Sequence, residues 1–378
     1  MSIASKLLNI LNIKDAIKKA IQTKGGSIND QTPFADYAPK ILSLPNQPDP
    51  FSIVFSLDNV GYPASLKMGS STTRVPKKIA FESLIRTVEF SQKIVVIETD
   101  AFTSSFLKRV EFPKSLTTIG SGAFKSCTKL TSLILNEGLQ VIGSNAFEGC
   151  NRIRGGITLH KLVIRLDYAC FSGCSYLEGV EILSDNLEIE SNVFYGCSAI
   201  KNVSFSNGVK TIASYAFYGC SSLKSIEIPD SVTLIGSYCF QNCVSATTLK
   251  LSQNISVINA SAFMGCSNLL YINIPDAITV IYSSAFQNCN KVKQIDIGIG
   301  LLQVNALCFG NCVAVEVIRC YAVNPPQAMT TNIFNVLLTN IKLYVPDESV
   351  NLYKASSYWS YFNVLPMSEY VDLGYVVT

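Results

Sequence analysis

The stretch "CSSLKSIEIPDSVTLIGSYCF", residues 220–240, contains the pattern that decides the fold. Its apolar residues Leu223, Ile226 and Ile228 predict a short strand, because polar side chains alternate with them. The "IPDS" that follows supplies a proline and an aspartate, which favour a turn. Two further apolar residues then return to the core, ahead of the final phenylalanine. The stretch predicts one strand, one turn and one return path.

The same unit recurs along most of the chain. It ends in motifs such as "AFEGC", "AFYGC" and "AFQNC", whose phenylalanines lie 23 residues apart except for one interval of 24. These residues are Phe124, Phe147, Phe171, Phe194, Phe217, Phe240, Phe263, Phe286 and Phe309, and Phe102 extends the series upstream. A fixed period of this length is typical of a repeat protein.

A unit of 23 residues is too small to bury its own apolar face, so stacked units must share one continuous core. The strands of successive turns would then pair in parallel, about 4.8 Å apart. About ten turns give a body on the order of 50 Å long. The sequence therefore predicts one elongated domain.

Twelve of the 13 cysteines fall in two columns of the repeat: nine follow the phenylalanine by three residues, and three directly precede it. Free cysteine packs as a small hydrophobe, so we expect reduced, structural thiols. Three pairs have the spacing of half a zinc site, namely Cys170/Cys174, Cys239/Cys243 and Cys308/Cys312. These pairs lie three turns apart, on the order of 14 Å, so they cannot complete one site together. We predict no metal and no cofactor.

The units closely resemble the BspA-like leucine-rich repeat, the Treponema-type variant that reads roughly "L..I.IP.SV..IG..AF..C". The resemblance covers residues 84–320. It implies an α/β repeat fold, a right-handed leucine-rich-repeat solenoid of about ten 23-residue turns with parallel strands, a small helical N-terminal segment and terminal caps. It also implies recognition of a protein or a surface, without catalysis.

Residues 321–366 look like the terminal cap of the same family. Val345, Tyr353, Trp359 and Phe362 would fold over the last repeat, whose apolar face would otherwise be exposed. We expect the single tryptophan to pack there rather than to bind a ligand. Residues 367–378 are expected to form a tail.

Composition and motifs argue against several functions. His160 is the only histidine, so a Ser-His-Asp or Cys-His apparatus would have to use it, and a solvated turn residue is the simpler interpretation. A glycan-cleaving enzyme would need a carboxylate pair in one cleft, whereas the acidic residues are scattered along a column. A net charge of +3 disfavours nucleic acid as a partner. No membrane span or signal peptide is apparent, so we expect no membrane insertion.

The remaining candidate surface is the strand face, where alternate side chains point away from the core. Its outward columns are polar and mixed in charge. The candidate binding residues there are Glu111, Glu181, Glu227, Tyr271, Asp296 and Arg319. Binding hot spots are usually Trp, Tyr or Arg, so Tyr271 and Arg319 stand out, and a merely solvated face is the alternative. The period breaks at residues 150–159, where Gly155 and Gly156 indicate a kink or a tolerated insertion.

Residues 1–44 match none of the repeats and predict two short amphipathic helices, which cannot bury enough surface alone. We expect this helical segment to anchor on a partner, on another copy or on the solenoid. The candidate docking residues are Ile13, Ile17, Ile21, Phe34, Tyr37 and Ile41. Residues 45–50 predict a Pro-rich linker, and residues 51–83 predict a β-rich N-terminal cap.

The stretch "IKDAIKKAIQTKGGSINDQTPFADYAPKI", residues 13–41, is similar to the N-terminal segment of many bacteriophage tail and tail-fibre proteins. This resemblance implies a non-enzymatic structural protein of the virion tail, made in the host cytoplasm. Residues 1–44 would dock on other tail or baseplate proteins. The solenoid would contact a host surface protein or glycan during adsorption, and a homo-oligomer is a further option. A bacterial BspA-like surface adhesin or protein-interaction module is the alternative.

Overall fold

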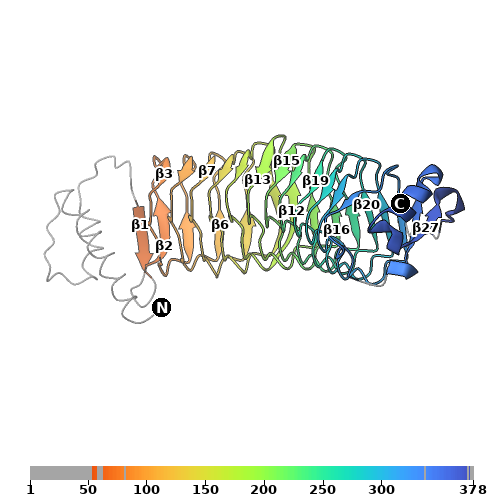
Figure 1. Ribbon diagram of the computed structural model, residues 1–378. Coiled ribbons are helices and arrows are strands. Elements are labelled where there is room, and N and C mark those ends of the chain that lie inside the picture. Colours follow the sequence, from red (N-terminus) through yellow and green to blue (C-terminus); the bar gives the residue numbers. More distant parts are fainter. Residues whose placement is uncertain (1–52, 58–62, 81, 336–337, 373, 375–378) are drawn as a thin grey trace, which may run out of the picture.

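The computed structural model describes residues 53–57, 63–80, 82–335, 338–372 and 374 as an elongated solenoid, whose strands follow one another along its long axis (Figure 1). Each turn contributes one strand to each of two parallel stacks. The predicted helical segment, residues 1–44, and the linker, residues 45–50, lie outside the described residues.

One stack carries the outward columns discussed above, and we call it the strand face. Its members are β2 (Pro63–Met68), β4 (Thr87–Glu89), β6 (Arg109–Glu111), β8 (Ser132–Ile134), β10 (Gly155–Leu159), β12 (Leu177–Ile182), β14 (Asn202–Ser204), β16 (Ser225–Glu227), β18 (Thr248–Lys250), β20 (Tyr271–Ile274), β22 (Gln294–Ile297), β24 (Val317–Cys320), β26 (Lys342–Val345) and β27 (Asn363–Pro366). Equivalent residues of neighbouring turns are in register, as Glu227 is with Lys250 and Asp296 with Arg319. Each outward column is therefore a straight row along the solenoid.

The second stack consists of shorter strands. They are β3 (Arg74–Val75), β5 (Val96–Ile97), β7 (Thr118–Ile119), β9 (Val141–Ile142), β11 (Arg165–Leu166), β13 (Leu187–Ile189), β15 (Val209–Ile212), β17 (Leu234–Ile235), β19 (Val257–Ile258), β21 (Val280–Ile281), β23 (Gln303–Val304) and β25 (Gln327–Ala328). The structure has about 13 turns, whereas the sequence predicts about ten. The difference arises because strand pairing continues through turns that have lost the phenylalanine and cysteine columns. At the N-terminal end, β1 (Ile53–Leu57) pairs antiparallel with β2.

A ladder of phenylalanine rings runs through the core. Successive rings from Phe102 to Phe334 are stacked, with centroids 5.1 to 5.7 Å apart. Phe334 continues the series one turn beyond the phenylalanines that the repeat motif identifies. The ladder keeps the turns in register. If any one turn were displaced sideways, its ring would lose contact with the rings of both neighbouring turns.

The cysteines form a second ladder beside the rings. All 13 are buried and free, which confirms the packing role expected of them. The thiol in the main column donates to the carbonyl oxygen of the phenylalanine one turn earlier; for example, Cys150 Sγ lies 3.0 Å from the oxygen of Phe124. Burial raises the pKa of most of these thiols, and that of Cys197 to about 12. Such thiols remain protonated and are poor nucleophiles.

The C-terminal cap covers the last turn with η2 (Leu338–Asn340), β26, η3 (Asp347–Ser349), α3 (Val350–Ala355), η4 (Trp359–Tyr361), β27 and η5 (Met367–Glu369). Trp359 is buried, and its Nε1 donates to the carbonyl oxygen of Pro326 at 2.7 Å. The Tyr353 hydroxyl likewise donates to the oxygen of Ala322 at 2.8 Å. The packing role predicted for Trp359 is confirmed.

Candidate functional site

The residues proposed from the sequence fall into three groups. The docking residues Ile13, Ile17, Ile21, Phe34, Tyr37 and Ile41 lie outside the described residues. Glu111, Glu181 and Glu227 lie exposed on separate turns of the strand face. The structure brings Tyr271, Asp296 and Arg319 together, as described below.

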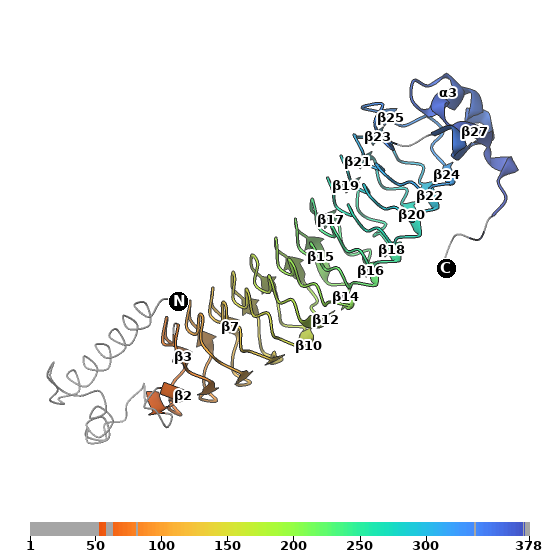
Figure 2. The same ribbon diagram turned by 90° about the horizontal axis from the view of Figure 1, so that it is seen from below.

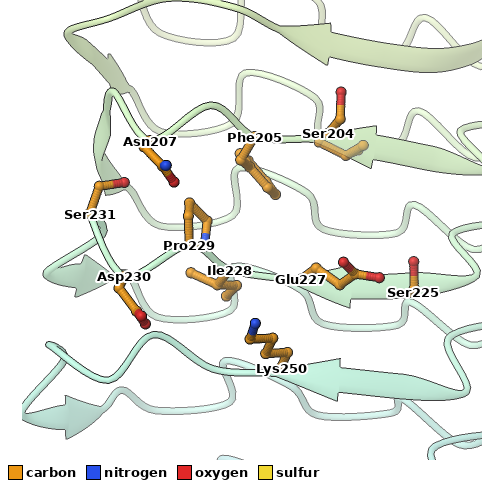
Figure 3. Close-up of a pocket in the computed structure, with 11 residues that line it drawn as sticks. Ser204, Phe205, Asn207, Ser225, Glu227, Ile228, Pro229, Asp230, Ser231 and Lys250 are labelled. Carbon is orange, nitrogen blue, oxygen red and sulfur yellow. The ribbon is translucent and has the colours of Figure 1, made fainter. Parts of the chain in front are cut away.

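A hollow of about 530 Å³ opens on the strand face where β14, β16 and β18 lead into their turns (Figure 3). Phe205, Ile228 and Pro229 form its apolar part, while Glu227, Asp230 and Lys250 bring charges of both signs. Lys250 extends from the neighbouring strand toward Ile228 (Figure 3).

A second hollow of about 390 Å³ lies over β10, β12 and β14. It shares the lining residues Val203 and Ser204 with the first, so the two hollows adjoin over five turns, and we call the two together the central groove. Thr158 Oγ1 donates to Glu181 Oε2 at 3.0 Å within it. The predicted residues Glu181 and Glu227 therefore both line this groove.

Two glycines on adjacent turns form the floor of the second hollow, Gly156 and Gly179. Neither has a left-handed backbone, and an added Cβ would lie 3.5 Å or more from the nearest atom at either position. The preceding Gly155 differs, because its φ of +75° favours glycine. The backbone thus demands glycine only at Gly155. At Gly156 and Gly179 the fold does not require glycine, and the absence of side chains there leaves the groove open.

Sequence reasoning missed most of the groove. The double glycine at residues 155–156 was the available signal, and it was interpreted as a kink or an insertion. Phe205, Pro229 and Asp230 belong to turns, which the comparison of strand columns did not include.

A polar cluster lies farther along the strand face, on β20, β22 and β24. Asp296 Oδ1 accepts from Arg319 Nε at 2.7 Å and from Gln294 Nε2 at 2.9 Å, and Arg319 Nη2 also donates to Asp296 Oδ2. The Tyr271 hydroxyl donates to Asp296 Oδ2 at 2.5 Å. Burial and this hydrogen bond raise the pKa of Tyr271, and the bond to Asp296 raises the pKa of Arg319. Both groups therefore keep their protons at neutral pH.

A patch of four tyrosines lies at the turns around the phenylalanine ladder. Tyr195 stacks on Tyr218 and Tyr215 on Tyr238, each pair with centroids 4.7 Å apart. Tyr215 and Tyr238 have φ near +60°, which is rare for bulky residues. The motifs "VFYGC", "SYAFY" and "SYCF" were the signal for this patch, and reasoning about strand columns alone passed over it.

Other kinds of site have little support. Within the described part of the chain, no three His, Cys, Asp or Glu side chains are grouped so that they could hold a metal ion. No helix among the described residues has the length and apolar character needed to cross a bilayer. His160 follows β10 and is half-buried.

Comparison with protein families assigns the repeats. The family model described as the BspA type leucine rich repeat region matches in six copies, over residues 59–178 and 187–316. The chain belongs to this family. Leucine-rich repeats generally mediate protein interaction. No curated protein matches the chain.

The chain is only distantly similar to solved structures. A leucine-rich repeat protein from Bacteroides ovatus is 24% identical, with 68% of this chain and 78% of that chain covered and a TM-score of 0.43. A leucine rich cell surface protein from Faecalibacterium prausnitzii is 20% identical, covering 71% and 93%, with a TM-score of 0.36. The pneumococcal vaccine antigen PcpA is 20% identical, covering 83% and 81%, with a TM-score of 0.45.

Proposed function

We propose that this BspA-type repeat protein is a non-enzymatic recognition scaffold that binds a segment of a partner protein along the central groove. The observation that supports this proposal is the open floor at Gly156 and Gly179, which the fold itself does not require. If this face served only as a solvated surface, the absence of side chains on two adjacent turns would have no physical advantage.

The lining of the groove favours a polypeptide as the ligand. Apolar surface from the half-buried Phe205 and Pro229 lies beside Glu227 and Lys250, so side chains of either kind find a complement. The strands also place polar groups at intervals of about 4.8 Å along the groove. An extended segment could thus contact several turns at once.

The test fills the groove without changing the rest of the chain. Peptides selected from a display library on the wild-type protein would be measured against Gly179→Tyr and against Thr87→Tyr, which adds the same ring to exposed β4 outside the groove. We expect Gly179→Tyr to weaken binding at least tenfold, and Thr87→Tyr to leave it unchanged. Equal binding to both variants would refute the groove as the site. Selective, groove-dependent binding on a glycan array would refute the polypeptide, and cleavage of cell-wall polysaccharide would refute the non-enzymatic role.

A second candidate function concerns where the scaffold is carried. The resemblance of residues 13–41 to tail and tail-fibre segments favours a place in a virion tail, with host attachment as the role of the solenoid. A bacterial surface adhesin is the competing location. Detection of the protein in purified phage particles would support the first, and detection only in bacterial surface fractions would refute it. Full-length protein with Ile17→Asp and Phe34→Asp should remain folded and be lost from the particles; normal incorporation would contradict the anchoring role.

A further inference from the structure

The polar cluster on β22 and β24 is covered by a segment from the far C-terminal end. The Tyr370 ring lies over the guanidinium of Arg319, 4.6 Å from Cζ to the ring centroid. It is nearly perpendicular to the Tyr344 ring, at a centroid distance of 5.2 Å and an interplanar angle of 80°. Its hydroxyl donates to Gln294 Oε1 at 3.3 Å, across 76 residues of sequence. One side chain thus contacts three turns of the strand face.

This cover changes the environment of the strand face. Glu111 and Glu227, in the same outward column as Asp296, are exposed. Asp296 is only 4% exposed and Gln294 is fully buried, so β22 is buried on both faces. Figure 2 shows the chain leaving β27 on the side of the solenoid that carries β20, β22 and β24. Tyr271 and Arg319 cover Asp296 from the neighbouring strands, and the returning segment adds the cover over Arg319 and Gln294.

The segment is attached mainly through one residue. After the short η5 turn, Tyr370 has extended backbone, with φ −69° and ψ 129°. Glu369 is exposed and Val371 is 72% exposed, whereas Asp372 Oδ1 accepts within the segment, from the Tyr370 hydroxyl at 3.4 Å and from Gly374 N at 2.9 Å. Ser368 N donates to Asp347 Oδ1 at 3.0 Å and fixes the start of the segment. A single aromatic side chain that packs into a site already formed by other residues is the typical arrangement of a binding hot spot.

We propose that Arg319, Gln294 and Tyr344 form a binding site for a tyrosine side chain of a partner protein, and that Tyr370 occupies this site in cis. The ligand class follows from the occupant: a ring that lies on the guanidinium, packs perpendicular to a second aromatic ring and carries a hydroxyl for the amide oxygen. Asp296 holds the guanidinium in place by accepting hydrogen bonds from its Nε and Nη2. The site lies outside the central groove, so the proposal stands independently of the function proposed above.

Occupation in cis sets how strongly a partner must bind. A tethered segment acts at an effective concentration on the order of mM, so a partner segment of similar intrinsic affinity would compete poorly. Removing Tyr370 should therefore raise the apparent affinity of an added segment, on the order of tenfold. The C-terminal segment would then act as a built-in competitor.

The experiment uses the full-length chain and a peptide with the sequence of residues 365–374, "LPMSEYVDLG", whose tyrosine carries a fluorine. Binding is measured by broadening of the fluorine resonance. We expect binding to Tyr370→Ala protein that is on the order of tenfold tighter than to wild type. A peptide with alanine in place of its tyrosine should not bind. Equal binding to wild type and to Tyr370→Ala, or no binding to Tyr370→Ala, would overturn the proposal.

Two further variants separate a binding site from a structural cover. Arg319→Lys in the Tyr370→Ala background keeps the charge opposite Asp296 but removes the planar group under the ring, so peptide binding should fall severalfold. Tyr282→Ala removes an exposed tyrosine elsewhere and should leave the weak binding of wild type unchanged. Thermal melts followed by circular dichroism establish that each variant is folded. Undiminished binding to the Arg319→Lys double variant would refute the assigned site.

Discussion

Gly179 provides the sharpest test of the claim that the groove floor is open for function. An added Cβ there would lie 3.6 Å from the carbonyl oxygen of Asn202, an ordinary van der Waals contact, and the backbone is not left-handed. Alanine also loses less conformational entropy on folding than glycine does. We therefore expect Gly179→Ala to stabilise the protein by about 0.4–1 kcal/mol.

Gly236 supplies the matched control. A Cβ there would lie 2.3 Å from the backbone nitrogen of Ser214 and 2.5 Å from the carbonyl carbon of Ala213, both on the preceding turn. These atoms belong to backbone and cannot move aside cheaply. Gly236→Ala should therefore destabilise the protein by about 1–3 kcal/mol or more, because adjacent turns must separate.

Urea denaturation followed by far-UV circular dichroism measures both effects on the free energy of unfolding, with the slope used to check that the transition is comparable. The two glycines should change the midpoint in opposite directions. If Gly179→Ala destabilised the protein by more than about 1 kcal/mol, the fold would need this glycine and the argument for an open floor would fail. Gly179→Tyr, used above in the binding assay, depends on this result.

Three further predictions concern the core and the cap. Phe217→Ala removes a ring stacked 5.2 Å from both Phe194 and Phe240, and should cost about 3–5 kcal/mol in urea denaturation; a cost below about 1 kcal/mol would contradict the ladder. Burial raises the pKa of Cys197 to about 12, so the unfolded thiol ionises first and stability falls as pH rises above about 8.5. Between pH 8.5 and 10, Cys197→Ala should lose about 1.6 kcal/mol less than wild type, and identical losses would refute this account. Trp359→Ala should raise hydrogen exchange in the cap, whereas Tyr361→Ala, at an exposed position, should not.

The sequence was a strong guide to the repeats and a weak guide to the sites. The period and the apolar columns predicted the strands, the buried phenylalanines and the structural thiols, because each turn contacts mainly its neighbours. They missed turns that had lost the Ala-Phe and cysteine columns. Two of the strand-face candidates chosen from the sequence, Glu181 and Glu227, line the groove in the structure. The sequence pattern did not indicate the floor at Gly179 or the turn residue Phe205. Polar and small outward residues follow no period, so no column marks them.

By itself, the sequence of this protein determined a parallel solenoid of BspA-type repeats, with an aromatic and thiol core. That outcome follows from local pattern, since a 23-residue unit with one buried face can be satisfied only by stacking on its own kind. The tertiary structure alone decided which outward residues meet. It set two hollows side by side at Val203 and Ser204, and it returned Tyr370 to Gln294 across 76 residues. The physical reason is that core packing repeats with the chain, whereas contacts on the outer face depend on where the chain travels after the last repeat.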